Sequence, residues 1–162
     1  MKNISIISII LIVCIVLFAC STTNNNAQLK FYYCTAQLKF GSGDSPVQSE
    51  NRKEALDRLA YDRIIEQYLE GPISPDLNSP YPDGTSLISI TVEQQTANVI
   101  LNDAFAQLTG IDLTMACTCL SLTVGELTGC VKVQISAQNA LLDNKQSITI
   151  DTNSISFVDS NT

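Results

Sequence analysis

Six cysteines and the complete absence of histidine set the chemistry that is open to this 162-residue chain. Without histidine the chain lacks the usual general base, the Ser-His and Cys-His nucleophile systems and the commonest metal ligand. Cysteine sulfur can still carry lipid, form or exchange disulfides, and bind metal. The possible functions therefore depend on where the cysteines lie.

Cys20 ends the tetrapeptide LFAC, directly behind an uncharged run from Ile4 to Phe18. A basic residue (Lys2), an apolar core that is short for a membrane span, and a small residue before cysteine are typical of lipoprotein signal peptides. We therefore expect cleavage before Cys20, lipidation of its sulfur by diacylglycerol or palmitate chains, and anchoring outside the cytoplasmic membrane. An ordinary cleaved signal peptide and an uncleaved N-terminal anchor are the alternatives.

The chain that follows this leader is acidic. Of the nine basic residues, Lys2 lies in the leader, so eight stand against 16 acidic residues, a formal net charge of −8. Such a surface repels nucleic acid and anionic lipid headgroups. We expect no nucleic-acid partner, attachment to the membrane through the lipid at Cys20, and a partner that is an envelope protein or a second copy of this chain.

Three segments follow from composition. Residues 1–19 form the expected signal peptide, and residues 20–28, which include the polar run STTNNNAQ, form a flexible tether because they offer too little apolar area to fold. Residues 29–158 form the expected folded domain, a size that supports one hydrophobic core.

The four cysteines of this domain are Cys34, Cys117, Cys119 and Cys130. Cys117 and Cys119 fall in the middle of a predicted helix, where they point about 200° apart and so cannot bond to each other. We expect a structural disulfide between Cys119 and either Cys34 or Cys130, with buried free thiols as the alternative. Structural zinc usually takes cysteine pairs with two to four residues between them, so we expect no metal site.

The elements that would position these cysteines follow from apolar periodicity. Leu29 to Thr35 and Gln37 to Phe40 predict two short strands, and a helix is expected from Asn51 to Glu70, ended by Gly71-Pro72. Its core stripe is expected to comprise Leu56, Ala60, Tyr61, Ile64, Ile65, Tyr68 and Leu69. Glu54, Arg58, Asp62 and Glu66 form an exposed charged face, which we interpret as solvated rather than catalytic.

The second half of the domain predicts a hairpin, a helix and a further strand pair. The expected elements are strands at 86–92 and 96–101, a helical turn at 102–108, a helix at 112–127 capped by Gly129, a strand at 130–135, and a hairpin from Leu141-Leu142 to 147–150. The expected buried face of the second helix comprises Met115, Ala116, Cys119, Leu120, Thr123 and Leu127, opposite Thr114, Thr118, Ser121 and Gly125. The fold class is therefore α+β: a single domain in which two main helices pack on one face of a mixed β-sheet.

Five successive blocks of the sequence resemble the GerM domain, a family named from sporulation and spore germination. They are Ile64 to Pro72 (IIEQYLEGP), Ser79 to Thr85 (SPYPDGT), Leu87 to Val99 (LISITVEQQTANV), Asn102 to Phe105 (NDAF) and Leu120 to Gln134 (LSLTVGELTGCVKVQ). Their order and spacing match over roughly residues 31–151. The chain departs from the family pattern at its four domain cysteines and at Thr128-Gly129, where the family often has proline and glycine.

This resemblance implies a small extracytoplasmic domain, often lipid-anchored and similar to the ring-building motifs that assemble between membranes during spore formation. It brings no catalytic residue and no cofactor, because its Gly-Pro and Pro-rich blocks determine backbone shape. We therefore expect a non-enzymatic binding or assembly domain in sporulation or spore germination. The alternatives are a cell-wall or glycan-binding lipoprotein and an envelope thiol-disulfide oxidoreductase that uses Cys117 and Cys119.

Overall fold

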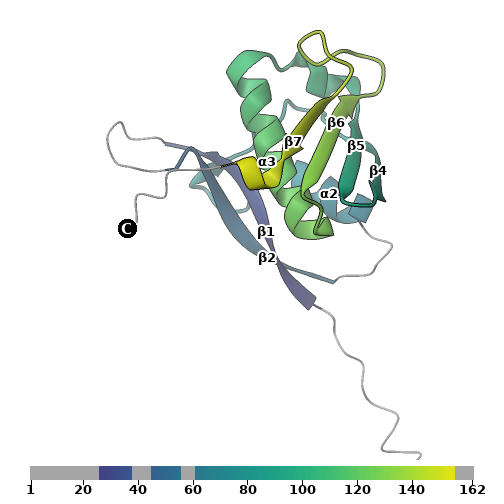
Figure 1. Ribbon diagram of the computed structural model, residues 1–162. Coiled ribbons are helices and arrows are strands. Elements are labelled where there is room, and N and C mark those ends of the chain that lie inside the picture. Colours follow the sequence, from purple (N-terminus) through teal and green to yellow (C-terminus); the bar gives the residue numbers. More distant parts are fainter. Residues whose placement is uncertain (1–25, 38–44, 56–60, 156–162) are drawn as a thin grey trace, which may run out of the picture.

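The computed structural model describes residues 26–37, 45–55 and 61–155, so the expected signal peptide and Cys20 lie outside the described residues (Figure 1). The helices are α2 (Tyr61–Leu69) and α3 (Gly110–Thr128), with 3-10 turns η1 (Asp103–Gln107) and η2 (Thr152–Ser154). The strands are β1 (Asn26–Thr35), β2 (Val47–Ala55), β3 (Leu77–Asn78), β4 (Leu87–Glu93), β5 (Thr96–Leu101), β6 (Lys132–Ala137) and β7 (Ile148–Asp151). They form a three-stranded sheet in the order β2-β1-β3 and a four-stranded sheet in the order β4-β5-β6-β7. The α+β class is thus confirmed.

The prediction of a helix at 51–70 is wrong in its first part, where the chain forms a strand of the three-stranded sheet. Residues 51–55 belong to β2, which pairs antiparallel with β1 in a continuous register from Asn26↔Ala55 to Cys34↔Val47. This long pairing overrides the local helical pattern, as tertiary context often does. The helix is α2, which begins at Tyr61, buries Ile64, Ile65 and Tyr68, and ends before Gly71, whose φ is 110°.

Strand β1 also revises the N-terminal boundary. It begins at Asn26, so residues 26–28 belong to the domain rather than to the tether, because their backbone pairs with β2. The second strand expected at 37–40 falls mostly outside the described residues. Instead, β1 gains a partner that the sequence did not predict: Leu77 and Asn78, in the Pro-rich connection, pair with Thr35 and Cys34.

The four-stranded sheet is close to its prediction. β4 and β5 form the antiparallel hairpin, which turns at Gln94 with φ 57°, and β5 runs parallel to β6 through the α3 crossover. The strand expected at 130–135 lies two residues later, because Gly129, at φ 72°, caps α3 and the chain must turn before it can pair. Asp143 and Asn144, both with positive φ, form a tight turn closed by the Leu142↔Lys145 bridge, and β7 then pairs with β6.

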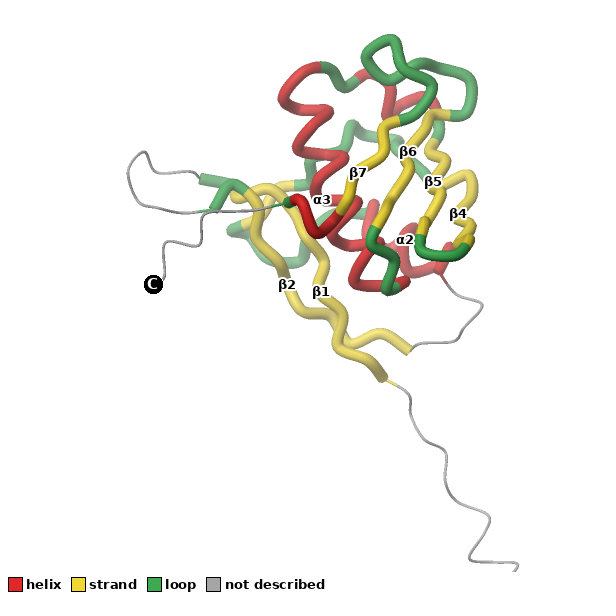
Figure 2. The backbone as a smooth tube through the Cα atoms, in the orientation of Figure 1, coloured by secondary structure: helices red, strands yellow, loops and turns green. Residues whose placement is uncertain are grey.

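Helix α3 lies between the two sheets (Figures 1 and 2). It contacts β1 on one side and β5, β6 and β7 on the other, while α2 contacts β4 on the same face of the four-stranded sheet. Because α3 packs on both sides, the prediction of a single buried face is wrong. Ser121, which was expected on the exposed face, is fully buried, and Met115, which was expected on the buried face, is only half-buried. By length and composition α3 could span a membrane, yet its burial between two sheets explains its apolar character.

Candidate functional site

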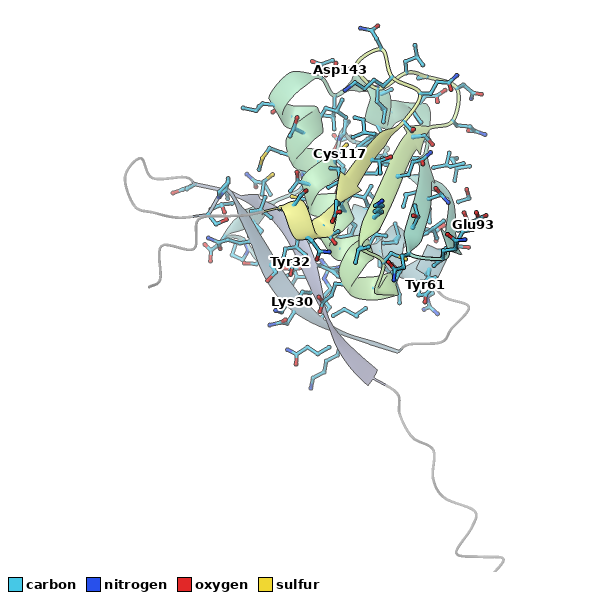
Figure 3. The ribbon with its side chains drawn as sticks, in the orientation of Figure 1. Lys30, Tyr32, Tyr61, Glu93, Cys117 and Asp143 are labelled. Carbon is cyan, nitrogen blue, oxygen red and sulfur yellow. The ribbon has the colours of Figure 1, made fainter. Side chains whose placement is uncertain are left out.

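Cys117 and Cys119, which Thr118 separates, are both buried in α3 (Figure 3 labels Cys117). Burial raises the pKa of Cys117 to about 12. The pKa of Cys119 is raised well above its usual range, first by a hydrogen bond with Cys34 and then by burial. A thiol-disulfide exchanger needs an accessible thiolate, so the geometry does not favour the interpretation of these two residues as a redox pair.

Cys119 lies on the stretch of α3 that β1 crosses: the Tyr32 amide donates to Thr123 Oγ1 at 3.0 Å, and Cys34, two residues further along β1, lines a groove with Asp112 and Met115 of α3. The other candidate partner, Cys130, follows the end of α3. The chain turns back at Gly129, so the Cys130 carbonyl lies 3.3 Å from where a Cβ of Gly125 would be, six residues or about 9 Å along α3 from Cys119. All four domain cysteines are free thiols in the structure. A disulfide from Cys119 to Cys34 or to Cys130 therefore stays a prediction.

The described part of the chain contains no group of three or more cysteine, aspartate or glutamate side chains that could hold a metal ion. The acidic residues expected on the first helix behave as a solvated face, because Asp62 and Glu66 are exposed on α2. Glu54 and Arg58 have side chains outside the described residues. The absence of a metal site and of a cofactor stays a prediction.

Three buried tyrosines form the main polar network of the interior. The Tyr33 hydroxyl donates to the Tyr68 carbonyl at 2.8 Å, and the Tyr68 hydroxyl donates to the Tyr32 carbonyl at 2.7 Å and contacts the Tyr81 hydroxyl. Burial raises the pKa of all three phenols, so none is a candidate acid or base near neutral pH. These contacts fasten α2 and the Pro-rich loop to β1, which is a structural role.

A second polar cluster, which we call the Arg52 clamp, consists of Arg52, Glu50 and the carbonyl of Gly71. Arg52 Nε donates to Glu50 at 2.7 Å, its terminal nitrogen donates to the Gly71 carbonyl at 2.6 Å, and its guanidinium lies 4.8 Å from the centroid of the Phe31 ring. Burial tends to raise the pKa of Glu50, but hydrogen bonds from the Ser74 amide, Arg52 and the Ile73 amide outweigh burial and lower it. This clamp could not be predicted from sequence, because residues 51–55 were assigned to a helix there and Glu50 and Arg52 were not expected to lie on a strand.

The edge strands of the four-stranded sheet are β4 and β7, and β4 is the longer of the two. Its residues 87–92 (LISITV) carry no charge, and Ile88 and Val92 are 45% and 39% exposed. β2, the edge strand of the other sheet, carries Glu50, Arg52 and Lys53 instead. Charged side chains protect sheet edges from pairing, so the exposed Lys53 guards β2, whereas β4 carries no charge before Glu93.

Two hollows flank the start of β4. One, of about 470 Å³, is lined by Leu87 together with the carboxylates of Glu66, Glu70 and Asp83. The other, of about 530 Å³, is lined by the apolar side chains of Ile88, Ile100 and Leu141. Glu93 ends the strand and Tyr61 begins the neighbouring α2 (Figure 3). β4 with these two hollows, which we call the β4 surface, thus combines an unpaired backbone with apolar and acidic side chains.

The chain was compared with known families, curated proteins and solved structures. The profile of the Germane family, described as "Sporulation and spore germination", matches residues 30–143. No curated protein gives a significant match.

The solved structures that resemble this fold include domains of a sporulation protein. The first GerMN domain of the sporulation protein GerM from Bacillus subtilis gives a TM-score of 0.54 at 14% identity, covering 70% of this chain and 84% of that one. The tandem GerMN domains of the same protein give 0.55 at 12% identity, covering 83% of this chain and 48% of that one. At such identities the likeness concerns the fold. The family match spans more than half of the chain, and the chain therefore belongs to the Germane family of sporulation and spore germination proteins.

Proposed function

We propose that this chain is a lipid-anchored, extracytoplasmic binding domain that acts in sporulation or spore germination without catalysing a reaction, and that it docks a protein partner on the β4 surface. The observation that carries the proposal is the difference between the two edge strands. β4 presents an uncharged edge with exposed Ile88 and Val92, whereas β2 presents charged side chains.

An open edge of this kind is suited to strand addition. Among the described strands β4 pairs only with β5, which leaves its outward amide and carbonyl groups to an extended segment from another protein. The hollow beside Ile88 and Leu141, which Gln138, Asn139 and Gln146 also line, can take a side chain of that segment. Backbone hydrogen bonds would supply affinity, and this hollow would supply specificity.

Charge indicates the kind of segment that fits. Glu66, Glu70 and Asp83 line the other hollow, and the mature chain carries a formal net charge of −8. Electrostatic complementarity favours a strand with lysine or arginine beside its apolar residues, and it disfavours a second copy of this acidic chain.

The rival classes have less support. No histidine is present, so the Ser-His and Cys-His nucleophile systems are not open to this chain, and the burial of the Cys117 and Cys119 thiols disfavours them as an exchange pair. Glycan binding commonly uses exposed aromatic rings, whereas Tyr33, Tyr68 and Tyr81 are buried.

Docking is tested by placing a photo-crosslinking amino acid at position 88 of the full chain in intact host cells. Position 111 is the matched control, because Ile111 is also an exposed isoleucine, at 78% exposure, but lies on α3. We expect a crosslinked adduct with one protein of the envelope from position 88 and none from position 111. Equal adducts from both positions, a second copy of this chain as the sole product, or hydrolase turnover that one Asp or Glu substitution abolishes would each contradict the proposal.

The anchor is tested separately with Cys20→Ala. Loss of the acceptor sulfur should abolish palmitate labelling and either release the protein from the membrane fraction or leave the precursor uncleaved. Cys14→Ala is the matched control, since Cys14 lies within the apolar run and should not accept lipid. Palmitate labelling that persists in the Cys20→Ala variant would contradict lipidation at this position.

A further inference from the structure

We propose that Cys34 and Cys119 form a disulfide that fastens β1 to the middle of α3. The bond joins positions 85 residues apart in the sequence and links the three-stranded sheet to the central helix. It is independent of the docking partner and of the lipid anchor.

The relative placement of β1 and α3 brings the two residues together. The Tyr32 amide donates to Thr123 Oγ1 at 3.0 Å, which fixes one point of contact between strand and helix. Two residues further along β1, about 6.6 Å, lies Cys34. One turn back along α3, about 6 Å, lies Cys119, so an antiparallel alignment of strand and helix places the two cysteines side by side.

A second observation fixes this direction. Cys34 lines a surface groove together with Met115 and Asp112, which precede Cys119 by one and two turns of α3. The strand therefore runs from Thr123 past Cys119 toward the start of the helix. The lowered pKa of Cys34 and the raised pKa of Cys119, each caused first by the other thiol, agree with this alignment.

The environments of the two sulfurs assign different roles to them. Cys34 is half-buried and reaches the groove, so an oxidant can approach it. Its pKa is lowered, because the hydrogen bond with Cys119 outweighs burial and the charge of Asp112. Cys119 is fully buried and has a raised pKa, so it reacts only with a group already held at Cys34.

The oxidant is a disulfide, either a small molecule such as oxidised glutathione or the active-site disulfide of an oxidoreductase. The Cys34 thiolate attacks one sulfur of this disulfide, forms a mixed disulfide and expels the other sulfur as a thiolate. Cys119 then loses its proton and attacks the Cys34 sulfur, expelling the second oxidant thiol. The protein loses two hydrogen atoms and the oxidant gains them as two thiols.

The remaining domain cysteines stay reduced under this proposal. Cys117 is buried and points about 200° away from Cys119 around the helix. Cys130 is buried beyond the end of α3. Neither lines the groove that gives access to Cys34.

Peptide mapping of the full wild-type chain tests the proposal without depending on the folding of any variant. The reduced protein is incubated with oxidised glutathione at neutral pH, its free thiols are blocked with N-ethylmaleimide, and it is digested without reductant. We expect peptides joined through Cys34 and Cys119, and blocked Cys117 and Cys130. Recovery of Cys34 and Cys119 as separate blocked or glutathione-bearing peptides, or a bond from Cys34 to Cys117 or Cys130, would overturn it.

A stability measurement adds a second readout. The oxidised chain should unfold at a higher urea concentration than the same chain after reduction, because the crosslink restricts the unfolded state. Cys34→Ser should unfold at one urea concentration whether or not glutathione disulfide is present. An equal shift in the wild type and in Cys34→Ser would contradict the assignment of the bond to Cys34.

Discussion

The two sheets that enclose α3 are held to it in different ways. The three-stranded sheet is joined to the rest of the domain by polar contacts, namely the tyrosine network, the Arg52 clamp and the Tyr32 to Thr123 hydrogen bond. The four-stranded sheet contributes an aliphatic inner face, in which Ala97, Val99, Leu101, Val133, Ile135 and Ala137 are buried.

Their edges differ as well. β2 carries Glu50, Arg52 and Lys53. Arg52 donates to the Gly71 carbonyl and Glu50 accepts from the Ser74 amide, so these two side chains hold the turn after α2 against the strand. β4 carries no charge before Glu93 and leaves two aliphatic side chains exposed. Buried side-chain hydrogen bonds therefore contribute more to the attachment of the three-stranded sheet, while an aliphatic face dominates that of the four-stranded sheet. The uncharged edge strand β4 belongs to the second of these sheets.

The largest effect should follow from breaking the Arg52 clamp. Arg52→Ala leaves Glu50 without its partner and the Gly71 carbonyl without a donor, while its side chain is only 11% exposed. We expect a loss of about 3 kcal/mol in the free energy of unfolding, measured by urea titration. Lys132→Ala, at an exposed position of β6, should change it by less than about 0.5 kcal/mol. Equal losses would remove the distinction between the two sheets.

A smaller loss is expected for Tyr68→Phe. This change removes the hydroxyl that donates to the Tyr32 carbonyl and contacts the Tyr81 hydroxyl, so both of these polar atoms lose a hydrogen-bond partner. We expect a loss of about 1–2 kcal/mol in thermal or urea unfolding. Tyr61→Phe is the control, because Tyr61 lies on the same helix but takes no part in this network. A null result for Tyr68→Phe would mean that packing alone holds α2 against β1.

Glu50 should make the clamp dependent on pH. Its pKa is lowered in the folded state, so the stabilisation is present above its unfolded pKa of about 4.3 and is lost as the pH falls through the folded value. We expect the Glu50→Gln variant to lose less stability than the wild type when the pH is lowered from neutral to acid. Urea unfolding across that range measures the difference. Parallel pH profiles for the two proteins would show that Glu50 is not the responsible group.

The smallest effect should come from Ser121→Ala. Ser121 Oγ is fully buried and has no hydrogen-bond partner among the described residues, so its removal should be neutral or slightly stabilising. Thr123→Ala, two residues away and equally buried, should cost about 1 kcal/mol because it leaves the Tyr32 amide unsatisfied. Urea titration of the two variants side by side measures the contrast, and equal effects would contradict the importance of the Tyr32 contact.

The second half of the domain could be predicted from sequence because its signals are local. The β4–β5 hairpin shows apolar alternation on both sides of a polar turn, and Gly129 marks the end of α3. The family could also be recognised, since its blocks lie in these segments and in α2.

The misassigned parts depend on contacts between distant residues. β2 is charged and reads as helix, and only its pairing with β1 makes it a strand. Ser121 is buried because α3 has a sheet on either side, which a single helical wheel does not predict. The open edge of β4 follows from strand order, and the Cys34 and Cys119 contact follows from how β1 crosses α3. Neither has a local signature.

Amide hydrogen exchange tests the central claim, that the β4 edge is the docking edge, most directly. The purified full chain is compared with the same chain in detergent extracts of the envelope that contain its partner, and β2 serves as the internal reference. We predict that the outward amides of β4, residues 87–93, exchange at least about tenfold more slowly in the complex, while those of β2, residues 47–55, are unchanged. Slower exchange at β2 with no change at β4 would contradict the account.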